Sequence, residues 1–290
     1  MRTSLFLLLL VLICSCGTGK IVTKDDGPEP TPVAVTTTQD TVIVQLPDSV
    51  RVVTAKEEKI DPVITKDTVV SNPPRVEIFN HVAWNLLLQK YVTKDGVVNY
   101  EGFRLDKGLL RDYIASLGAH MPDESWSQED KLAYWMNAYN AMTVDLIVRN
   151  LPLQSIKEID KPWDQRLWKL GAKWYNLDEI EHKILRKMGD ARIHFGINCA
   201  SFSCPPLLNK AFSAQQVDAQ LDQLARDFIN DPRRNMISED RVRLSKIFSW
   251  FSKDFKTNGT VIEYISKYSE KTINPNARKS FMEYDWSLNN

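Results

Sequence analysis

The chain has 290 residues, with 37 basic and 37 acidic side chains that leave a formal net charge of zero. This balance, without a basic stripe, argues against nucleic-acid binding as the main role. Beyond residue 20 no second long apolar segment occurs, so we expect no other part of the chain to enter a bilayer.

The first residues are typical of a secretory leader. Arg2 is followed by an apolar run over residues 5–13, which is too short to span a membrane as a mature helix. Ser15 directly before Cys16 resembles the lipobox of bacterial lipoproteins, whose cysteine is acylated and becomes the new N-terminus. The resemblance implies a signal peptide over 1–15, lipid on Cys16 and a location in the cell envelope.

The segment after the leader differs in composition from the rest of the chain. Residues 16–75 are rich in proline, threonine and valine and contain no aromatic residue, so they cannot bury enough apolar area to offset their conformational entropy. We predict a flexible tether there. Gly17 after the acylated cysteine resembles an outer-membrane signal, and the sequence leaves open whether the protein faces the periplasm or the cell surface.

Residues 76–290 contain aromatic residues throughout and have the length of one domain with a substantial core. Ser127 is a capping residue for a predicted helix over 129–150, which is apolar on nearly every side and therefore belongs in the middle of the domain. Asn137 and Asn140 lie on one face of this helix. Their amides either tie a loop to the helix or contact a substrate, with Asn137 as an orienting group.

A cluster of tryptophans precedes the histidine motifs. Trp163, Trp168 and Trp174 lie in a basic, aromatic stretch. Such side chains either belong to the core or line a cleft that binds a cell-envelope protein, a peptide or a glycan.

Two histidines lie in consecutive predicted elements. A helix over 177–186 contains Glu181 and His182, and alternation over 192–197 predicts a strand that contains His194. Glu181 and His182 point about 100° apart on a helix and cannot pair face to face, so if Glu181 acts on a histidine, that histidine should be His194. His194 itself is either a core histidine or a catalytic base.

Cys199 and Cys204 lie five residues apart at the end of this segment. In an oxidising compartment they form a disulfide, or one of them is a nucleophile activated by His194, or both have a buried structural role without any bond. A zinc site with His182, His194 and both thiols has suitable ligand types but no strong spacing pattern. We therefore predict no metal and no cofactor.

The C-terminal part is predicted to contain a hairpin over 235–245 and a helix over 248–255. Tyr284 and Trp286 are expected to pack against the central helix as the last part of the fold.

Four motifs in order resemble the domain-of-unknown-function 547 family: WMNAYNA at 135–141, LDEIEHKILR at 177–186, HFGINCASFSCPP at 194–206 and YDWSLN at 284–289. The resemblance covers residues 81–289 and implies a shared fold. It implies no activity.

Together these patterns predict an α+β fold: a helix-rich single domain with a small, mostly antiparallel sheet and a buried central helix, only loosely similar to papain or transglutaminase. The expected role is a ligand- or partner-binding module held on the membrane by an N-terminal lipid. The alternative is a cysteine-dependent hydrolase or acyl transferase that uses Cys199 or Cys204 with His194.

Overall fold

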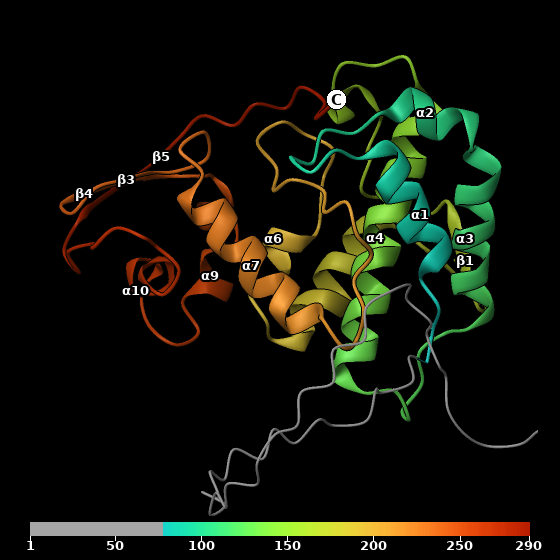
Figure 1. Ribbon diagram of the computed structural model, residues 1–290, viewed down its shortest axis with the longest axis horizontal. Coiled ribbons are helices and arrows are strands. Elements are labelled where there is room, and N and C mark those ends of the chain that lie inside the picture. Colours follow the sequence, from blue (N-terminus) through green and yellow to red (C-terminus); the bar gives the residue numbers. More distant parts are fainter. Residues whose placement is uncertain (1–77) are drawn as a thin grey trace, which may run out of the picture. The chain divides into compact units, whose positions relative to one another are not determined.

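The computed structural model describes residues 78–290 (Figure 1). The described residues lie in one compact unit, whose bounds are 68–290. The predicted signal peptide, the lipid site at Cys16 and the tether over 16–75 lie outside the described residues. No helix within 78–290 has the length and apolar character needed to cross a membrane.

The described part is helix-rich with two small sheets, which confirms the predicted α+β class. The longer helices are α1 (Val82–Tyr91), α2 (Tyr100–Leu105), α3 (Lys107–Ala119), α4 (Gln128–Asn150), α7 (Val217–Asn230) and α10 (Val261–Ser266). The short helical segments are η1 (Ile156–Glu158), α5 (Leu177–Glu179), η2 (Ile180–Ile184), η3 (Leu185–Met188), α6 (Ile193–Gly196), α8 (Ile247–Trp250) and α9 (Ser252–Phe255).

The sheets are mostly antiparallel, as predicted. Strands β1 (Trp168–Leu170) and β2 (Lys173–Tyr175) form an antiparallel hairpin. In the second sheet β4 (Arg241–Leu244) lies between β3 (Met236–Ile237), which is antiparallel to it, and β5 (Arg278–Phe281), which is parallel to it. The hairpin predicted over 235–245 is thus present, and its parallel neighbour comes from the end of the chain.

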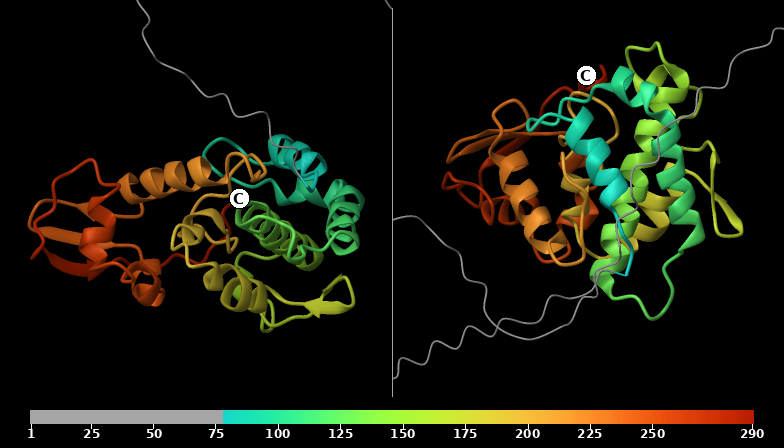
Figure 2. Two further views of the ribbon diagram at one scale, coloured as in Figure 1. Left: turned by 90° about the horizontal axis from the view of Figure 1, so that it is seen from below. Right: turned by 45° about the vertical axis from the view of Figure 1, so that its right-hand side comes forward.

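Helix α4 is the centre of the domain. Its first free amide groups are capped as predicted, because the Ser127 hydroxyl accepts a hydrogen bond from the Asp130 amide at 3.1 Å. Nearly every residue from Leu132 to Val148 is buried. Helices α2 and α3 pack on one side of α4, with α1 packed against these two, and α7 with the β3–β4–β5 sheet lies on the other side (Figures 1 and 2). The prediction of a buried central helix is confirmed.

Two predicted elements are wrong. Residues 193–196 form the short helix α6 and not a strand, because the Asp190 carboxylate accepts a hydrogen bond from the Arg192 amide at 2.8 Å and starts a helical turn. The side chains on both faces of the expected strand are buried. The alternation of residue types along this segment therefore did not indicate a buried and an exposed face. The helix expected over 248–255 is interrupted at Phe251 and forms α8 and α9.

Gly96 provides a test of how closely the turn after α1 packs on the cysteine segment. It has a φ of +78°, and a Cβ atom there would lie 2.4 Å from Pro206 Cβ and 2.9 Å from Pro206 Cα. We expect Gly96→Ala to lower the free energy of unfolding by about 2–4 kcal/mol, because strain and overlap add. Urea unfolding followed by circular dichroism measures this change.

Gly108 in α3 is the matched control, because an added Cβ meets nothing within 4 Å. Gly108→Ala is expected to stabilise the domain by about 0.5–1 kcal/mol through helix propensity. Equal effects of the two substitutions would contradict the tight contact at Gly96.

Candidate functional site

A cavity of about 350 Å³ lies where the cysteine segment, the η2 helix, α8 and the C-terminal segment meet. It contains thiol, imidazole, carboxylate and indole groups. Its lining includes the predicted site residues Trp163, Glu181, His182, His194, Cys199 and Cys204. The structure therefore brings most of the predicted residues to one hollow, although they come from several elements of the chain.

The loop that contains the two cysteines is tied at both ends by Asn198. Its side-chain oxygen accepts from the Ala200 amide at 2.8 Å, and its amide nitrogen donates to the Pro205 carbonyl at 2.8 Å. The Cys199 backbone amide donates to the Cys204 sulfur at 2.9 Å. Both thiols are free in the structure, with Cys199 partly exposed and Cys204 buried. The predicted disulfide thus stays a prediction for the oxidised protein.

The two thiols have opposite electrostatic environments. The pKa of the Cys199 thiol is lowered from 9.0 to about 6, mainly by a hydrogen bond from Cys204. Burial raises this pKa, but hydrogen bonds from Ser201 and Tyr284 also lower it. The Cys199 sulfur lies 3.2 Å from the Ser201 hydroxyl and 3.3 Å from the Tyr284 hydroxyl. Burial raises the pKa of Cys204. Cys199 is therefore the thiolate-forming member of the pair.

His194 has a carboxylate partner, but it is not the expected Glu181. The ring is 3% exposed, stacks on Phe251 at 3.9 Å between centroids, and donates from Nε2 to Asp254 Oδ2 at 2.8 Å. Burial lowers the pKa of His194 although Asp254 raises it. The break between α8 and α9 is what places Phe251 and Asp254 beside the imidazole.

Asp254 also forms a two-pronged ion pair with Arg186. The Arg186 Nε donates to Oδ2 at 2.6 Å and its Nη2 donates to Oδ1 at 2.8 Å. Burial raises the pKa of Asp254, but hydrogen bonds from Arg186 and His194 outweigh it and hold this pKa well below its usual range. The carboxylate is therefore ionised and holds both the Arg186 guanidinium and the His194 ring in position.

His182 lies at the other end of this polar chain. Its Nδ1 accepts from Arg186 Nη1 at 2.9 Å, which leaves the ring proton of the neutral form on Nε2, 3.4 Å from Asp178 Oδ1. Asp178 in α5, His182 in η2 and Arg186 in η3 are four residues apart along these consecutive helical segments, and η2 is the middle one. This segment is a π-helix, a distortion that is frequent at functional sites.

Glu181 points into the domain and not toward a histidine. It is buried, and its Oε2 accepts from the Tyr139 hydroxyl at 3.0 Å. Burial raises the pKa of Glu181. The carboxylate that contacts His194 is therefore Asp254, whereas Glu181 contacts Tyr139 on α4.

Asn137 and Asn140 both hold backbone segments against α4. Asn137 donates to the Phe212 carbonyl at 2.8 Å and accepts from the amide of the same residue at 2.9 Å. Asn140 donates to the Gly196 carbonyl at 2.9 Å and accepts from the Asn198 amide at 2.9 Å. Neither lines the cavity. Of the two predicted roles, the loop-tying one agrees with these contacts, and Asn140 fixes the start of the cysteine loop.

The three predicted tryptophans have different positions. Trp163 lines the cavity. Trp168 is buried, with its indole nitrogen donating to Asp145 Oδ2 at 2.8 Å. Trp174 is 51% exposed on β2, outside the cavity. Only Trp163 is placed to contact a ligand there.

Sequence reasoning missed much of the aromatic wall. Trp250 and Trp286 line the cavity with Tyr284, which packs on both indoles at centroid distances of 4.7 and 4.6 Å. Trp286 also meets Trp163 at 6.0 Å. The last motif of the family resemblance was a signal for Tyr284 and Trp286. Instead of packing mainly on the central helix, these two rings close the cavity over the cysteine loop.

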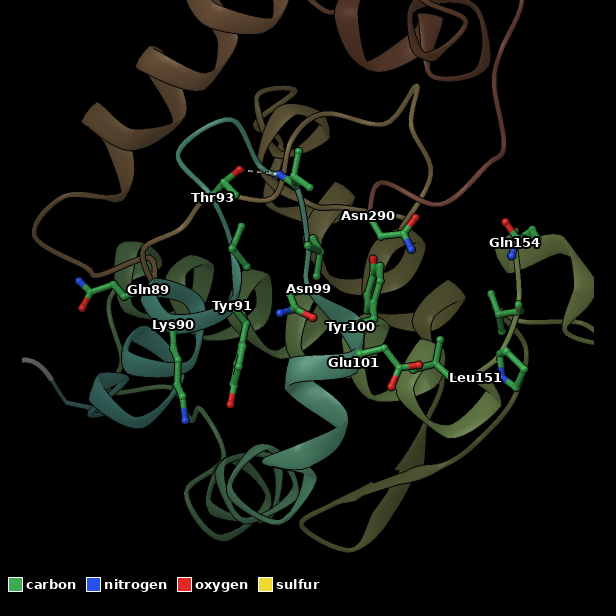
Figure 3. A pocket seen from close by; sticks show the side chains of 15 residues that line it. Gln89, Lys90, Tyr91, Thr93, Asn99, Tyr100, Glu101, Leu151, Gln154 and Asn290 are labelled. Atoms are coloured by element: carbon green, nitrogen blue, oxygen red, sulfur yellow. Dashed lines mark hydrogen bonds between the residues drawn. The ribbon is translucent and has the colours of Figure 1, made fainter.

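Other parts of the described chain offer less chemistry. Within residues 78–290 no group of three or more histidine, cysteine or acidic side chains is placed to hold a metal ion. A larger hollow of about 750 Å³ lies between the end of α1, the start of α2 and the segment 151–154 (Figure 3). It contains none of the predicted site residues, so the cavity at Cys199 is the candidate site.

The comparisons with known proteins agree with the motifs and add no activity. No curated protein and no solved structure matches the chain. A family model, described as a protein of unknown function, DUF547, matches residues 124–229. The match includes three of the four motifs, and the last motif at 284–289 lies outside it. The segment 124–229 is therefore similar to the DUF547 family, whose function is unknown.

Proposed function

We propose that this protein is a lipoprotein of the cell envelope, anchored by lipid on Cys16 and positioned in the outer membrane, whose folded domain binds a ligand in the cavity at Cys199. The leader and the proline-rich segment over 16–75 support the anchoring. The single observation that supports binding is the cavity itself, because it combines aromatic walls with ionisable side chains.

The lining favours a glycan among the ligands open to an envelope protein. Indole rings of Trp163, Trp250 and Trp286 offer flat apolar faces for the C–H faces of sugar rings. Asp164 and Asp178 also line the cavity and supply acceptors for sugar hydroxyls. A peptide that inserts an aromatic or apolar side chain is the other ligand class that such walls accommodate.

Substitution of Trp163 tests glycan binding. Titration of the full chain with chitotetraose and with maltotetraose, followed by tryptophan fluorescence and by calorimetry, is expected to show saturable binding of one of them. Trp163→Ala should weaken this binding about tenfold or more, because a stacking face is lost (about 1.4 kcal/mol). Trp174→Ala is the matched control, since this exposed indole lies outside the cavity. Absence of binding to either sugar, or equal losses in both variants, would contradict the proposal.

A second candidate is a cysteine-dependent hydrolase or acyl transferase with Cys199 as nucleophile. The lowered pKa of Cys199 favours it. The position of His194 weighs against it. Within the described residues the Cys199 sulfur contacts the Ser201 and Tyr284 hydroxyls, whereas the His194 imidazole contacts Asp254.

The rate of alkylation as a function of pH tests the state of Cys199. Iodoacetamide reacts with the thiolate, so the rate for Cys199 is expected to rise through a midpoint near pH 6 and to be nearly constant above pH 7. Buried Cys204, whose pKa is raised, should react far more slowly. Cys204→Ala removes the side-chain donor at position 204, which makes the largest contribution, and should move the midpoint upward. A midpoint near pH 8.5 for Cys199 in the protein that keeps both loop cysteines would show that Cys199 is an ordinary thiol.

A further inference from the structure

The cysteine loop contains two thiols that differ in exposure as well as in charge. Cys199 is partly exposed at the cavity, whereas Cys204 is 5% exposed behind it. The amide of Cys199 already bonds to the Cys204 sulfur at 2.9 Å, and Asn198 ties the two ends of the loop together. The second sulfur is thus held against the backbone of the residue that supplies the first.

The contacts of the Cys199 sulfur are suited to an oxygen-containing substrate. The Ser201 hydroxyl donates to the Tyr284 hydroxyl at 2.9 Å, which leaves the Tyr284 proton free to point at the sulfur 3.3 Å away. Burial holds the pKa of Tyr284 well above its usual range, so this phenol remains a donor. A chain of two hydroxyls therefore ends at the thiolate and can donate to an oxygen that departs beside it.

We propose that Cys199 and Cys204 form a redox couple that reduces a small organic hydroperoxide in the cavity. The cavity volume of about 350 Å³ lies within the range of small-molecule sites. The aromatic walls favour an apolar organic group on the peroxide. This inference does not depend on the proposed glycan binding.

The chemistry balances with the hydroperoxide as the oxidant. The Cys199 thiolate attacks the terminal peroxide oxygen, the O–O bond breaks, and Cys199 becomes a sulfenic acid while the alkoxide takes up the proton that the thiol released. The Cys204 thiol then attacks the Cys199 sulfur, an S–S bond forms and water leaves. One hydroperoxide and two thiols thus give one alcohol, one water and one disulfide. An external dithiol returns the pair to the reduced state.

The test uses the full chain with Cys14 and Cys16 replaced by serine, so that of its four cysteines only the two in the loop remain. The protein is reduced with dithiothreitol, freed of reductant and mixed with one equivalent of cumene hydroperoxide at pH 7. We expect one cumyl alcohol per chain, a mass lower by two hydrogens, and a rate at least about tenfold above that of the same chain unfolded in urea.

Three variants separate the steps. Cys204→Ser should retain the first step and accumulate a sulfenic acid on Cys199 that dimedone traps, whereas Cys199→Ser should lose the reaction. Tyr284→Phe should slow the first step without changing its product, and intact circular dichroism would show that each variant folds. A folded protein that reacts no faster than the unfolded chain, or that reduces oxidised glutathione but not the hydroperoxide, would overturn the assignment.

Discussion

Asp254→Asn is expected to lower the free energy of unfolding by about 3 kcal/mol, one of the largest effects of any single polar substitution in this domain. The carboxylate accepts from both Arg186 and His194, and only 22% of its side chain is exposed. An amide keeps the shape but removes the charge, so the Arg186 guanidinium is left without a counter-ion.

Urea unfolding at pH 7 measures this loss. Lys90→Ala is the control, because it breaks an ion pair with Asp106 in which the lysine side chain is 60% exposed, and such pairs contribute less than about 1 kcal/mol. The contribution of Asp254 should also depend on pH. The pKa of Asp254 is depressed, so its contribution is present above the pKa of the unfolded chain and declines as the pH falls below about 4. Similar losses in the two variants would argue that the Asp254 pair is a surface pair.

Removal of residues 284–290 is expected to destabilise the domain by about 4–6 kcal/mol, which approaches the whole stability of many domains of this size. This short segment crosses the cysteine loop and the end of α4. The Phe202 amide donates to the Ser287 carbonyl at 2.7 Å, and the Leu288 amide donates to the Gln154 carbonyl at 2.8 Å. Leu288 is buried as well.

The same truncation should raise the midpoint of Cys199 alkylation, because it removes the Tyr284 hydroxyl that lowers the pKa of this thiol. Deletion of Asn290 alone is the control, since this terminal residue is exposed. Calorimetry and the alkylation profile measure both effects. A truncated chain with unchanged melting behaviour would show that the segment does not belong to the cooperative unit.

The predicted site and the observed one share residues but differ in their pairing. Cys199 and His194 lie at one cavity, as their short separation in the chain suggested. The partner of His194 is Asp254, sixty residues further along the chain, and that distance in sequence left no local pattern to identify it. The hydroxyl partner of Cys199, Tyr284, is 85 residues away and was recognisable only as part of a motif.

Local sequence alone determined the central helix, its cap at Ser127 and the β3–β4 hairpin, because capping, apolar periodicity and turn residues act over a few neighbours along the chain. Tertiary structure decided that residues 193–196 are helical, that helix 248–255 breaks at Phe251, and which carboxylate meets His194. Where a segment is buried on all sides, apolar residues occur at every position, and their periodicity no longer distinguishes a strand from a helix. Ion pairs between distant segments depend on where tertiary packing places those segments. The pairing of Cys199 with hydroxyls instead of an imidazole follows from that packing.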